Sequence, residues 1–397
     1  MIPTCVENLS YSPHICGVYF LYLPQTSDSM AKYIYEYNNW TDFTWQDSVI
    51  NSIFGEVRLM QGKIIGQMNA LGFTAKEEAT LTALTLDVVK SSEIEGELLN
   101  YDQVRSSIAR RLGIQSAGLV KTNRHTEGIV EMMLDATQRY ELPLTEKRLF
   151  GWHAALFPTG FSGPYQIEVG CYRTKEMQVV SGAMGKEKVH YEAVRHEFVQ
   201  AEMTKFITWF NTNHSLDLLL KAAIAHFWFI IIHPFDDGNG RIGRALTDLL
   251  LARSEGSGER FYSMSSQILE ERKMYYAVLQ KVQHSSNDIT EWINWFLHCH
   301  KSAMLATEHT TQQILKKAAF WTLHEKTSIN ERQRKVVNML FDKFEGKLQS
   351  SKWAKINKTS SDTALRDIKD LVEKGILKQT NEGGRSINYE LVDFNLP

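Results

Sequence analysis

The chain has few cysteines, and none lies in a pattern that binds metal or forms a redox pair. The four are scattered along 397 residues without CxxC or metal-ligand spacing: Cys5, Cys16, Cys171 and Cys299. A disulfide framework or a structural zinc site needs closer and more regular spacing. The scarcity therefore predicts a reducing compartment, and we expect the protein in the cytoplasm.

The chain also lacks an excess of charge of one sign. Lys and Arg number 44 and Asp and Glu number 46, which gives a formal net charge of −2. Nothing in this overall balance indicates a nucleic-acid or membrane partner. With 43% hydrophobic residues over this length, the sequence predicts two or three domains and a substantial core.

No apolar run in the sequence is long enough to cross a membrane. The apolar segment 216–232 is interrupted by Lys221 and His226, and the remaining runs fall short of the roughly 20 residues that a bilayer requires. We therefore expect a buried helix here and no membrane partner. The sequence also contains no internal repeat and no low-complexity segment.

The first residues contain an apolar patch at 15–23 that could be mistaken for a signal peptide. Residues 1–14 carry no Lys or Arg, so the basic region of a signal peptide is missing. We expect Met30 to be the native start. Residues 1–29 are then a leader of doubtful structure.

What the sequence does contain is a dense group of polar and glycine residues at 233–244, which reads HPFDDGNGRIGR. The stretch from Asp236 to Gly240 favours a turn, because glycine and asparagine tolerate positive φ. A helix is predicted from Arg241, since apolar residues follow at spacings of three and four: Ile242, Leu246, Leu249 and Leu250. Such a turn at a helix N-terminus presents amide N–H groups at the positive end of the helix dipole, an arrangement that binds phosphate.

Four side chains of this group fit the chemistry of a bound polyphosphate. Arg241 and Arg244 share one face of the first helical turn, where each can donate a pair of hydrogen bonds to phosphate oxygens. Asp237 offers a hard oxygen ligand for Mg²⁺. His233 is the candidate general base, because imidazole titrates near neutral pH.

Two other interpretations of the motif compete with this one. The spacing Gly238-x-Gly240-x-x-Gly243 satisfies the dinucleotide-binding fingerprint, but the preceding segment is typical of a helix and not of a strand. A single histidine beside a proline is more often a packed core residue than a base. The complete pattern of the twelve residues 233–244 favours phosphate binding over both of these interpretations.

The twelve residues resemble the signature of the Fic family, His-x-Phe-x-[Asp/Glu]-[Gly/Ala]-Asn-[Gly/Lys]-Arg-x-x-Arg, at every specified position. Similar Fic proteins are mostly AMP transferases, so the resemblance implies ATP as co-substrate and Mg²⁺, or alternatively Mn²⁺, as the ion. It implies that His233 is the catalytic base, that Asp237 holds the metal and that Phe235 is structural. It also implies phosphate binding by the loop and first helical turn: Gly238, Asn239, Gly240, Arg241, Ile242, Gly243 and Arg244.

A second motif lies upstream, at the end of a predicted helix. Ser91 and Glu95 are four residues apart and share a helix face, and Gly96 is a natural C-terminal stop. The three residues resemble the inhibitory motif of the Fic family, [Ser/Thr]-x-x-x-Glu-[Gly/Asn]. The resemblance implies that Glu95 pairs with Arg244 and so competes with the γ-phosphate of ATP. The alternative is a solvated glutamate at a helix end.

Two further segments resemble the family more loosely. A β-hairpin is predicted around a glycine-containing turn after Tyr172, and it resembles the Fic flap, which pairs its main chain with a target segment. The flap residues are Val179, Val180 and Ser181. Tyr275 and Tyr276 lie on a later amphipathic helix and resemble the tyrosines that line the adenine pocket in the family. For one of these two, ordinary packing is nearly as good an explanation.

The predicted fold is mainly α, with a Fic-type helical core, a β-hairpin flap and a small C-terminal winged-helix domain. The predicted domains are the leader 1–29, an N-terminal helical region with the inhibitory motif at 30–118, the catalytic core at 119–325 and the winged helix at 326–397. Helices are expected at 46–111, 120–140, 146–156, 191–213, 216–232, 241–253, 267–283 and 288–320. Thr145 is the expected N-cap of the helix at 146–156.

The C-terminal segment predicts three helices followed by a hairpin, an order that resembles a winged helix. Ser360 or Ser361 is expected to cap the third helix, with Gly383 and Gly384 at the tip of the wing. We expect an exposed face of mixed charge on that helix: Asp362, Arg366, Asp367, Lys369 and Asp370. Because DNA binding normally needs a clearly basic face, target docking or dimerisation is favoured over DNA as its role.

Together these features predict an autoinhibited, Mg²⁺-dependent protein adenylyltransferase. It would transfer AMP to Ser, Thr or Tyr hydroxyls of a target protein and of itself. A second copy of the chain, in a homodimer, is a further candidate partner. Two alternatives stay open. The same site could remove AMP from a modified protein, with Glu95 helping to position water. The chain could instead be a DNA-binding regulator whose core senses nucleotide without transferring it.

Overall fold

A computed structural model describes most of the chain. The described residues are 11–13, 18–21, 33–37, 39–69, 73–114, 120–181, 188–212, 215–341, 344, 346–380 and 387–393. They form two compact units, Met1–Asn69 with Lys76–Thr307, and Ala70–Ala75 with Glu308–Pro397. We call the first the larger unit and the second the C-terminal unit.

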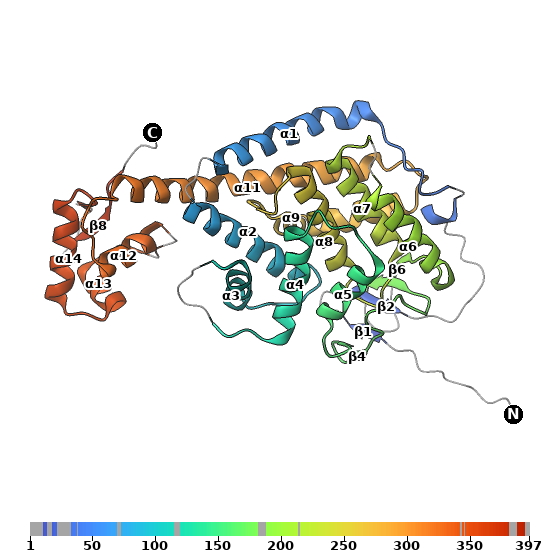
Figure 1. The fold of residues 1–397 in the computed structure, drawn as a ribbon, viewed down its shortest axis with the longest axis horizontal. Helices are drawn as coiled ribbons and strands as arrows, with labels where there is room; N and C mark the ends of the chain where they lie inside the picture. Colours follow the sequence, from blue (N-terminus) through green and yellow to red (C-terminus); the bar gives the residue numbers. More distant parts are fainter. Residues whose placement is uncertain are drawn as a thin grey trace. The chain divides into compact units, whose positions relative to one another are not determined.

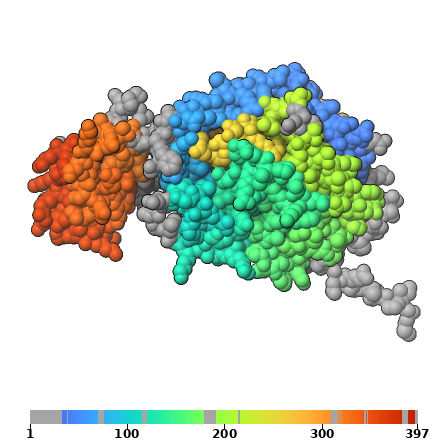
Figure 2. Space-filling view, in the orientation of Figure 1, coloured from blue at the N-terminus to red at the C-terminus, as the bar shows by residue number. Residues whose placement is uncertain are grey.

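The larger unit is mainly helical (Figure 1). Its helices, in whole or in part, are η1 Ile34–Glu36, α1 Asp47–Asn69, α2 Phe73–Ile94, α3 Tyr101–Leu112, α4 Arg124–Gln138, α5 Glu146–Leu156, α6 His196–Asn211, α7 Leu218–Ile232, α8 Asn239–Glu255, α9 Met264–Glu270, α10 Arg272–Gln283 and α11 Thr290–Leu323. The space-filling view shows α1 in blue and α4 and α5 in teal to green on one face of this unit (Figure 2).

The centre of the larger unit is the pair α7 and α8, which lie side by side (Figure 1). α7 is buried on all sides from Ala222 to Ile232. Its one lysine, Lys221, lies near the start of the helix and donates from Nζ to the carbonyl of Thr212 at 2.8 Å. α8 is buried from Arg241 to Ala252. Because both helices are buried over most of their length, the two ends of the loop that joins them are held in place.

Local sequence signals begin and end several of these helices. The hydroxyl of Thr145 accepts from the backbone N–H of Arg148 at 3.1 Å, which confirms the predicted cap of α5. α2 ends at Ile94, and Gly96 follows with φ +83°, the left-handed conformation that stops a helix. Asn100 then caps α3. The range 46–111, expected to be helical, is therefore three helices.

Two other boundaries differ from the sequence prediction. α8 begins at Asn239 and not at Arg241, because Gly238 alone provides the left-handed turn, with φ +80°. Gly240 is already helical. The helix predicted over 267–283 is broken at Glu271, which leaves helical geometry at φ −96° and ψ 19° and separates α9 from α10.

The predicted flap hairpin is present as two antiparallel strands, β5 Gln178–Ser181 and β6 Lys188–Glu192. Its turn, 182–187, lies outside the described residues. The sheet has the order β1-β2-β5-β6, with β1 at Tyr11–Pro13 and β2 at Val18–Leu21. β2 pairs antiparallel with β5, so part of the predicted leader shares a sheet with this hairpin. The target-docking role of Val179, Val180 and Ser181 stays a prediction. A second hairpin joins β3 Phe161–Ser162 to β4 Tyr165–Gln166.

The C-terminal unit has the predicted element order. α12 Glu331–Phe341, α13 Ser350–Asn357 and α14 Ser361–Glu373 precede the antiparallel pair β7 Leu377–Thr380 and β8 Asn388–Leu391. Its buried core is Phe320, Val336, Val337, Leu348, Trp353, Ala364, Ile368, Leu371, Ile376 and Leu377. The winged-helix assignment stays a prediction, and Gly383 and Gly384 lie outside the described residues.

Ser360 caps α14 as predicted, since its hydroxyl accepts from the N–H of Thr363 at 3.2 Å. One expectation for this helix is wrong. Asp367 is buried and not on the exposed face, because Arg332 donates to it from Nε at 2.8 Å and from Nη2 at 3.0 Å. This pairing holds the pKa of Asp367 below its usual value despite the opposing effect of burial.

Candidate active site

His233 lies at the point where α7 ends, in the left-handed conformation with φ +51°. Its Nδ1 lies 3.3 Å from the carbonyl oxygen of Ile230. Since a carbonyl can only accept, Nδ1 carries the proton and Nε2 is the basic nitrogen. Burial, with the positive charge of Arg173, lowers the pKa of His233 to about 4. The imidazole is therefore neutral at pH 7, as a general base must be.

Arg173 fixes the main chain on which His233 stands. Its guanidinium donates to the carbonyl of His233 at 2.8 Å and of Lys175 at 2.8 Å, and also to the carbonyl of Val194. The buried hydroxyl of Tyr191 on β6 donates to the carbonyl of Ile231 at 2.6 Å. These donors satisfy carbonyls at the C-terminus of α7, where a cation is also favoured by the helix dipole.

The loop after His233 is held by the side chain of Asn239. Its amide nitrogen donates to the carbonyl of Phe235 at 2.8 Å, and its oxygen accepts from the N–H of Phe235 at 3.0 Å. The ring of Phe235 is fully buried and stacks on His153 with centroids 4.3 Å apart. The predicted phosphate ligand Asn239 thus uses its side chain to close the loop, which leaves its backbone N–H for an anion.

The N-terminus of α8 faces the start of this loop and has the features of an anion site. The first N–H groups of a helix, here those of Asn239, Gly240 and Arg241, have no acceptor inside the helix. The N–H of Ile242 already donates to the carbonyl of Gly238 at 3.0 Å, and the Ile242 side chain is fully buried. Ile242 therefore packs the helix, and its phosphate-binding role stays a prediction.

Glycine is required at two of these positions. A Cβ on Gly238 would lie 2.9 Å from the ring of Phe157, and the φ of +80° also disfavours other residues. A Cβ on Gly240 would lie 2.1 Å from Oε1 of Glu95. The carboxylate of Glu95 is therefore directly against the first turn of α8. Gly243 is packed against Ile230 of α7.

Asp237 is buried at the edge of this anion site. Its carboxylate accepts from the N–H of Gly238 at 2.5 Å and from the hydroxyl of Ser162 in the β3–β4 hairpin. Arg241 Nη2 lies 3.9 Å from Oδ2 of Asp237. Among the described residues, no group of three metal-ligating side chains occurs. A single carboxylate nevertheless fits Mg²⁺, which commonly takes one or two carboxylates with substrate phosphates and waters.

The predicted inhibitory residues meet the second arginine of the motif. Arg244 donates from Nη2 to Oε1 of Glu95 at 2.7 Å. Its Nε donates to the hydroxyl of Ser91 at 2.8 Å, and Nη2 donates to the carbonyl of Ser91 at 2.9 Å. The Arg244 side chain is only 2% exposed. The structure thus brings Ser91, Glu95 and Arg244 together, across a sequence separation of about 150 residues.

The first arginine of the motif meets a residue that sequence reasoning missed. Arg241 donates from Nη1 to Oε2 of Glu97 at 2.8 Å, and its guanidinium lies 5.0 Å from the centre of the Phe157 ring. Glu97 also contacts Nε2 of His125 on α4. Glu97 stands outside the family motif, and no sequence pattern links it to Arg241. Ser162, Arg173 and His125 were missed for the same reason.

The two tyrosines predicted for the adenine pocket differ in environment. Tyr275 is buried, and its hydroxyl lies 2.9 Å from Nε2 of the buried His226. Tyr275 is therefore part of the core. Tyr276 is half-buried, with the Arg272 guanidinium 5.6 Å from its ring centre. Burial and the charge of Glu95 raise the pKa of Tyr276. The adenine-pocket role of both residues stays a prediction.

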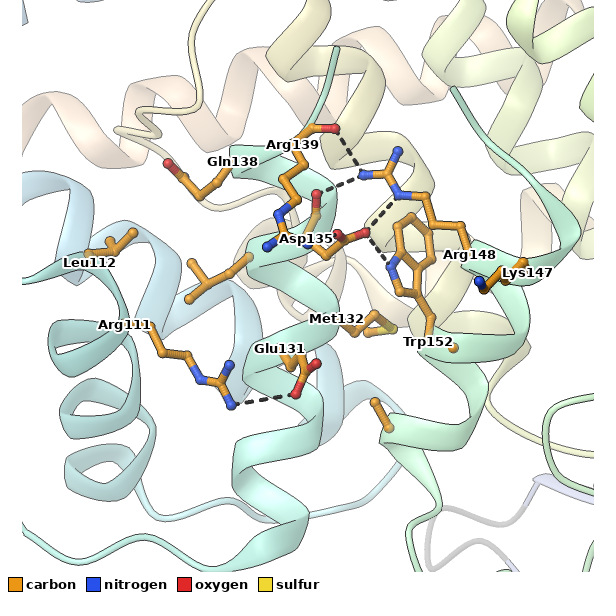
Figure 3. Close-up of a pocket in the computed structure, with 13 residues that line it drawn as sticks. Arg111, Leu112, Glu131, Met132, Asp135, Gln138, Arg139, Lys147, Arg148 and Trp152 are labelled. Carbon is orange, nitrogen blue, oxygen red and sulfur yellow. Dashed lines mark hydrogen bonds and ion pairs between the residues drawn. The ribbon is translucent and has the colours of Figure 1, made fainter. Parts of the chain in front are cut away.

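A separate cavity of about 540 Å³ lies between α3, α4 and α5, and its lining does not include the motif residues. Figure 3 shows Arg148 and Trp152 of α5 pointing toward Asp135 of α4. The carboxylate of Asp135 accepts from Arg148 Nε at 2.7 Å and from Trp152 Nε1 at 2.8 Å. These polar groups fasten α5 to α4, the helix that carries His125.

The fold and the site define a mainly helical protein with small hairpins and a glycine-containing loop at the N-terminus of a central helix. Residues 143–251 match the model of the Fic/DOC family, and residues 33–114 match a domain of unknown function, DUF4172. Residues 143–251 are therefore similar to the Fic/DOC family, and the chain has distant similarity to protein adenylyltransferases.

Two relatives show how far the sequence similarity extends, and one solved structure shows a similar fold. Protein adenylyltransferase fic-1 of Caenorhabditis briggsae is 34% identical over 90 residues, 22% of this chain and 16% of that protein. Protein adenylyltransferase Fic of Drosophila virilis is 26% identical over 260 residues, 63% of this chain and 48% of that protein. The crystal structure of a Fic family protein from Desulfovibrio desulfuricans is 20% identical, with a TM-score of 0.51 over 89% of this chain and 99% of that one. The chain thus spans about half or less of these two adenylyltransferases.

Of the helices that the structure describes, none has both the length and the apolar composition needed to span a bilayer. The most apolar one, α7, has 15 residues and includes Lys221, which agrees with the expectation of a buried helix.

Proposed function

We propose that this chain is an autoinhibited, Mg²⁺-dependent protein adenylyltransferase that transfers AMP from ATP to a hydroxyl of a target protein and of itself. One observation carries the proposal. The carboxylate of Glu95 lies against Gly240 and pairs with Arg244, so an anionic group of the chain already occupies the turn where a phosphate would bind. A helix N-terminus with two buried arginines favours an anion there.

In the proposed reaction, His233 accepts the proton of a Ser, Thr or Tyr hydroxyl at Nε2. The hydroxyl oxygen forms a bond to the α-phosphorus of ATP, the bond between that phosphorus and the α,β-bridging oxygen breaks, and pyrophosphate leaves. Arg241 binds the β-phosphate region, Arg244 the γ-phosphate, and the amides of Asn239 and Gly240 the oxygens between them. Positioning and charge stabilisation provide most of the catalysis in such transfers.

Asp237 is the residue that would hold the metal. Mg²⁺ held there would neutralise charge on the phosphates and orient them, and Mn²⁺ prefers the same oxygen ligands. The hydroxyl of Ser162 and the N–H of Gly238 both donate to the Asp237 carboxylate. These two hydrogen bonds fix the direction of the carboxylate.

Inhibition follows from competition for Arg244. While this guanidinium is bonded to Glu95 and Ser91, it cannot bind the γ-phosphate, so ATP would bind without its α-phosphate aligned for attack. The hydrogen bonds are 2.7 to 2.9 Å long and the arginine is buried, which makes this a strong, charge-assisted contact. Release of the end of α2 is then the activating step.

The same groups can also serve AMP removal, with Glu95 placing the attacking water. A third role, nucleotide sensing with DNA binding through the C-terminal unit, is less favoured. The exposed charged residues of α14 are Asp362, Arg366, Lys369 and Glu373, which carry no net charge, whereas DNA binding needs a clear basic surface. Target docking or dimerisation fits this unit better.

The experiment that tests the proposal is intact-mass spectrometry after incubation with ATP and Mg²⁺. The wild-type chain, Glu95→Gly and Glu95→Gly/His233→Ala are compared. We expect an AMP-sized mass increase on Glu95→Gly, little on the wild type and none on the double variant. With Asp237→Ala added to Glu95→Gly, the increase should fall by about 100-fold or more, as removal of a group that stabilises charge in the transition state does.

The alternatives give different results in the same assay. If no variant gains mass although calorimetry shows that ATP binds, the chain is not an adenylyltransferase toward itself. An AMP-modified hydroxyl protein then becomes the substrate to test. If Asp237→Ala retains full transfer, the metal role is wrong.

A further inference from the structure

We propose that Glu97 is a second inhibitory carboxylate, which blocks Arg241 and hence the β-phosphate position, as Glu95 blocks Arg244. The proposal rests on the proposed function, because it adds a second contact to the regulation of the same site. Its basis is the contact between Arg241 Nη1 and Glu97 Oε2 at 2.8 Å, in which the arginine side chain is 4% exposed.

A single short segment delivers both carboxylates to the motif. α2 ends at Ile94, and the left-handed Gly96 turns the chain, so that Glu95 and Glu97 lie on the two sides of this turn. The N–H of Glu97 donates to the carbonyl of Ser92 at 3.0 Å, which ties the residue after the turn back to the helix. Both glutamates therefore reach the first turn of α8 together.

Glu97 is held in place from its other side by α4. Its Oε1 contacts Nε2 of His125, while Oε2 accepts from Arg241. Burial raises the pKa of Glu97, but the bond with His125 and the charge of Arg241 outweigh it and lower the pKa overall. Glu97 is therefore an anion in the resting state, and it is fixed to two elements besides its own segment.

Arg241 cannot bind a phosphate in this arrangement without losing Glu97. Its guanidinium lies over the ring of Phe157 and 3.9 Å from the carboxylate of Asp237, so its side chain has little space to turn to a new partner. Loss of Glu95 alone would free Arg244 and leave Arg241 paired. The inference is that the resting state has two contacts to break, one for each phosphate-binding arginine.

The two contacts can be told apart by the number of phosphates on the ligand. The measurement is calorimetric binding of AMP, ADP and ATP with Mg²⁺ to the full chain carrying His233→Ala, which prevents turnover. In this background Glu97→Gln should tighten ADP and ATP binding by about 5-fold, a modest factor because Glu97 is partly exposed. AMP, which has no β-phosphate, should bind unchanged. Glu95→Gly should tighten ATP more than ADP.

Two matched variants serve as controls. Glu93→Gln removes a carboxylate from the same segment, but Glu93 pairs with Lys90 at 2.7 Å and not with the motif, so nucleotide affinity should not change. His125→Asn loosens Glu97 without touching Arg241 and should raise ADP affinity by a smaller factor than Glu97→Gln. It tests the same contact if Glu97→Gln folds poorly.

The proposal is overturned if Glu97→Gln binds ADP and ATP no more tightly, or if AMP binding tightens equally. Failure of the proposed function looks different. In that case none of the variants, including Glu95→Gly/Glu97→Gln, binds any of the three nucleotides, and both proposals fall. If Glu95→Gly tightens ATP binding while Glu97→Gln and His125→Asn have no effect, only the second contact is refuted.

Discussion

Replacing Asn239 by alanine tests whether its side chain binds phosphate or closes the loop, two roles that the family motif does not distinguish. As a phosphate ligand, its side chain would matter only when nucleotide is bound. In the structure, its amide makes two buried hydrogen bonds to the backbone of Phe235, at 2.8 and 3.0 Å. Asn239→Ala should therefore destabilise the protein with no nucleotide present.

The expected size follows from the groups left unpaired. The variant leaves one N–H and one carbonyl of Phe235 buried without a hydrogen-bond partner, which costs about 1–3 kcal/mol for each group. The free energy of unfolding should therefore fall by about 2–6 kcal/mol. At about 2–4 °C per kcal/mol, the thermal midpoint should fall by at least about 4 °C. Asn239→Asp keeps the acceptor but faces the Phe235 carbonyl with a second oxygen, so it should be destabilised as well.

The assay is thermal unfolding without nucleotide, followed by circular dichroism, with Asn100→Ala as the reference. Asn100 is exposed and accepts one hydrogen bond at the start of α3, so its replacement should cost only about 1 kcal/mol. An unchanged midpoint for Asn239→Ala, together with weaker ATP binding, would refute the loop-closing role and restore the phosphate-ligand interpretation.

Two further predictions concern stability. Burial, with nearby arginines, lowers the pKa to about 3 for His226, about 4 for His233 and about 3 for His300. Histidine in the unfolded chain has a pKa near 6.5. Between the folded and the unfolded pKa values, the unfolded chain therefore binds more protons than the folded chain. Stability should be complete above about pH 6.5 and fall from there toward pH 4. Urea midpoints from pH 8 to 4.5 test this, and a midpoint that stays constant over the range contradicts it. Gly128→Ala should cost about 1–3 kcal/mol, because its Cβ would lie 1.9 Å from the carbonyl oxygen of Ala155 where α4 meets α5. Gly151→Ala on α5, with no atom near its Cβ, should be neutral or stabilising, and equal midpoints for the two variants would show that α4 and α5 are not this close.

The sequence alone determined the features that depend on neighbours along the chain. The cap at Thr145, the helix stop at Gly96 and the cap at Ser360 each need only a residue and the backbone within a few positions. The same holds for the loop and helix at 233–244, because the turn and the apolar spacing lie within a dozen residues. These local rules were sufficient to predict the turn and the helix that follows it, apart from a helix start two residues too late.

Only the tertiary structure decided which charged groups meet. Glu97 and Arg241 are 144 residues apart, Ser162 and Asp237 are 75 apart, and Arg173 reaches the carbonyl of His233 over 60 residues. The amphipathic pattern shows which face of a helix is buried, but it does not show which neighbour that face meets. Asp367 was misplaced for this reason, because its position on α14 was read correctly as polar while its partner, Arg332, comes from another helix. Pairings of this kind depend on how the helices pack, and the packing results from apolar contacts over the whole unit.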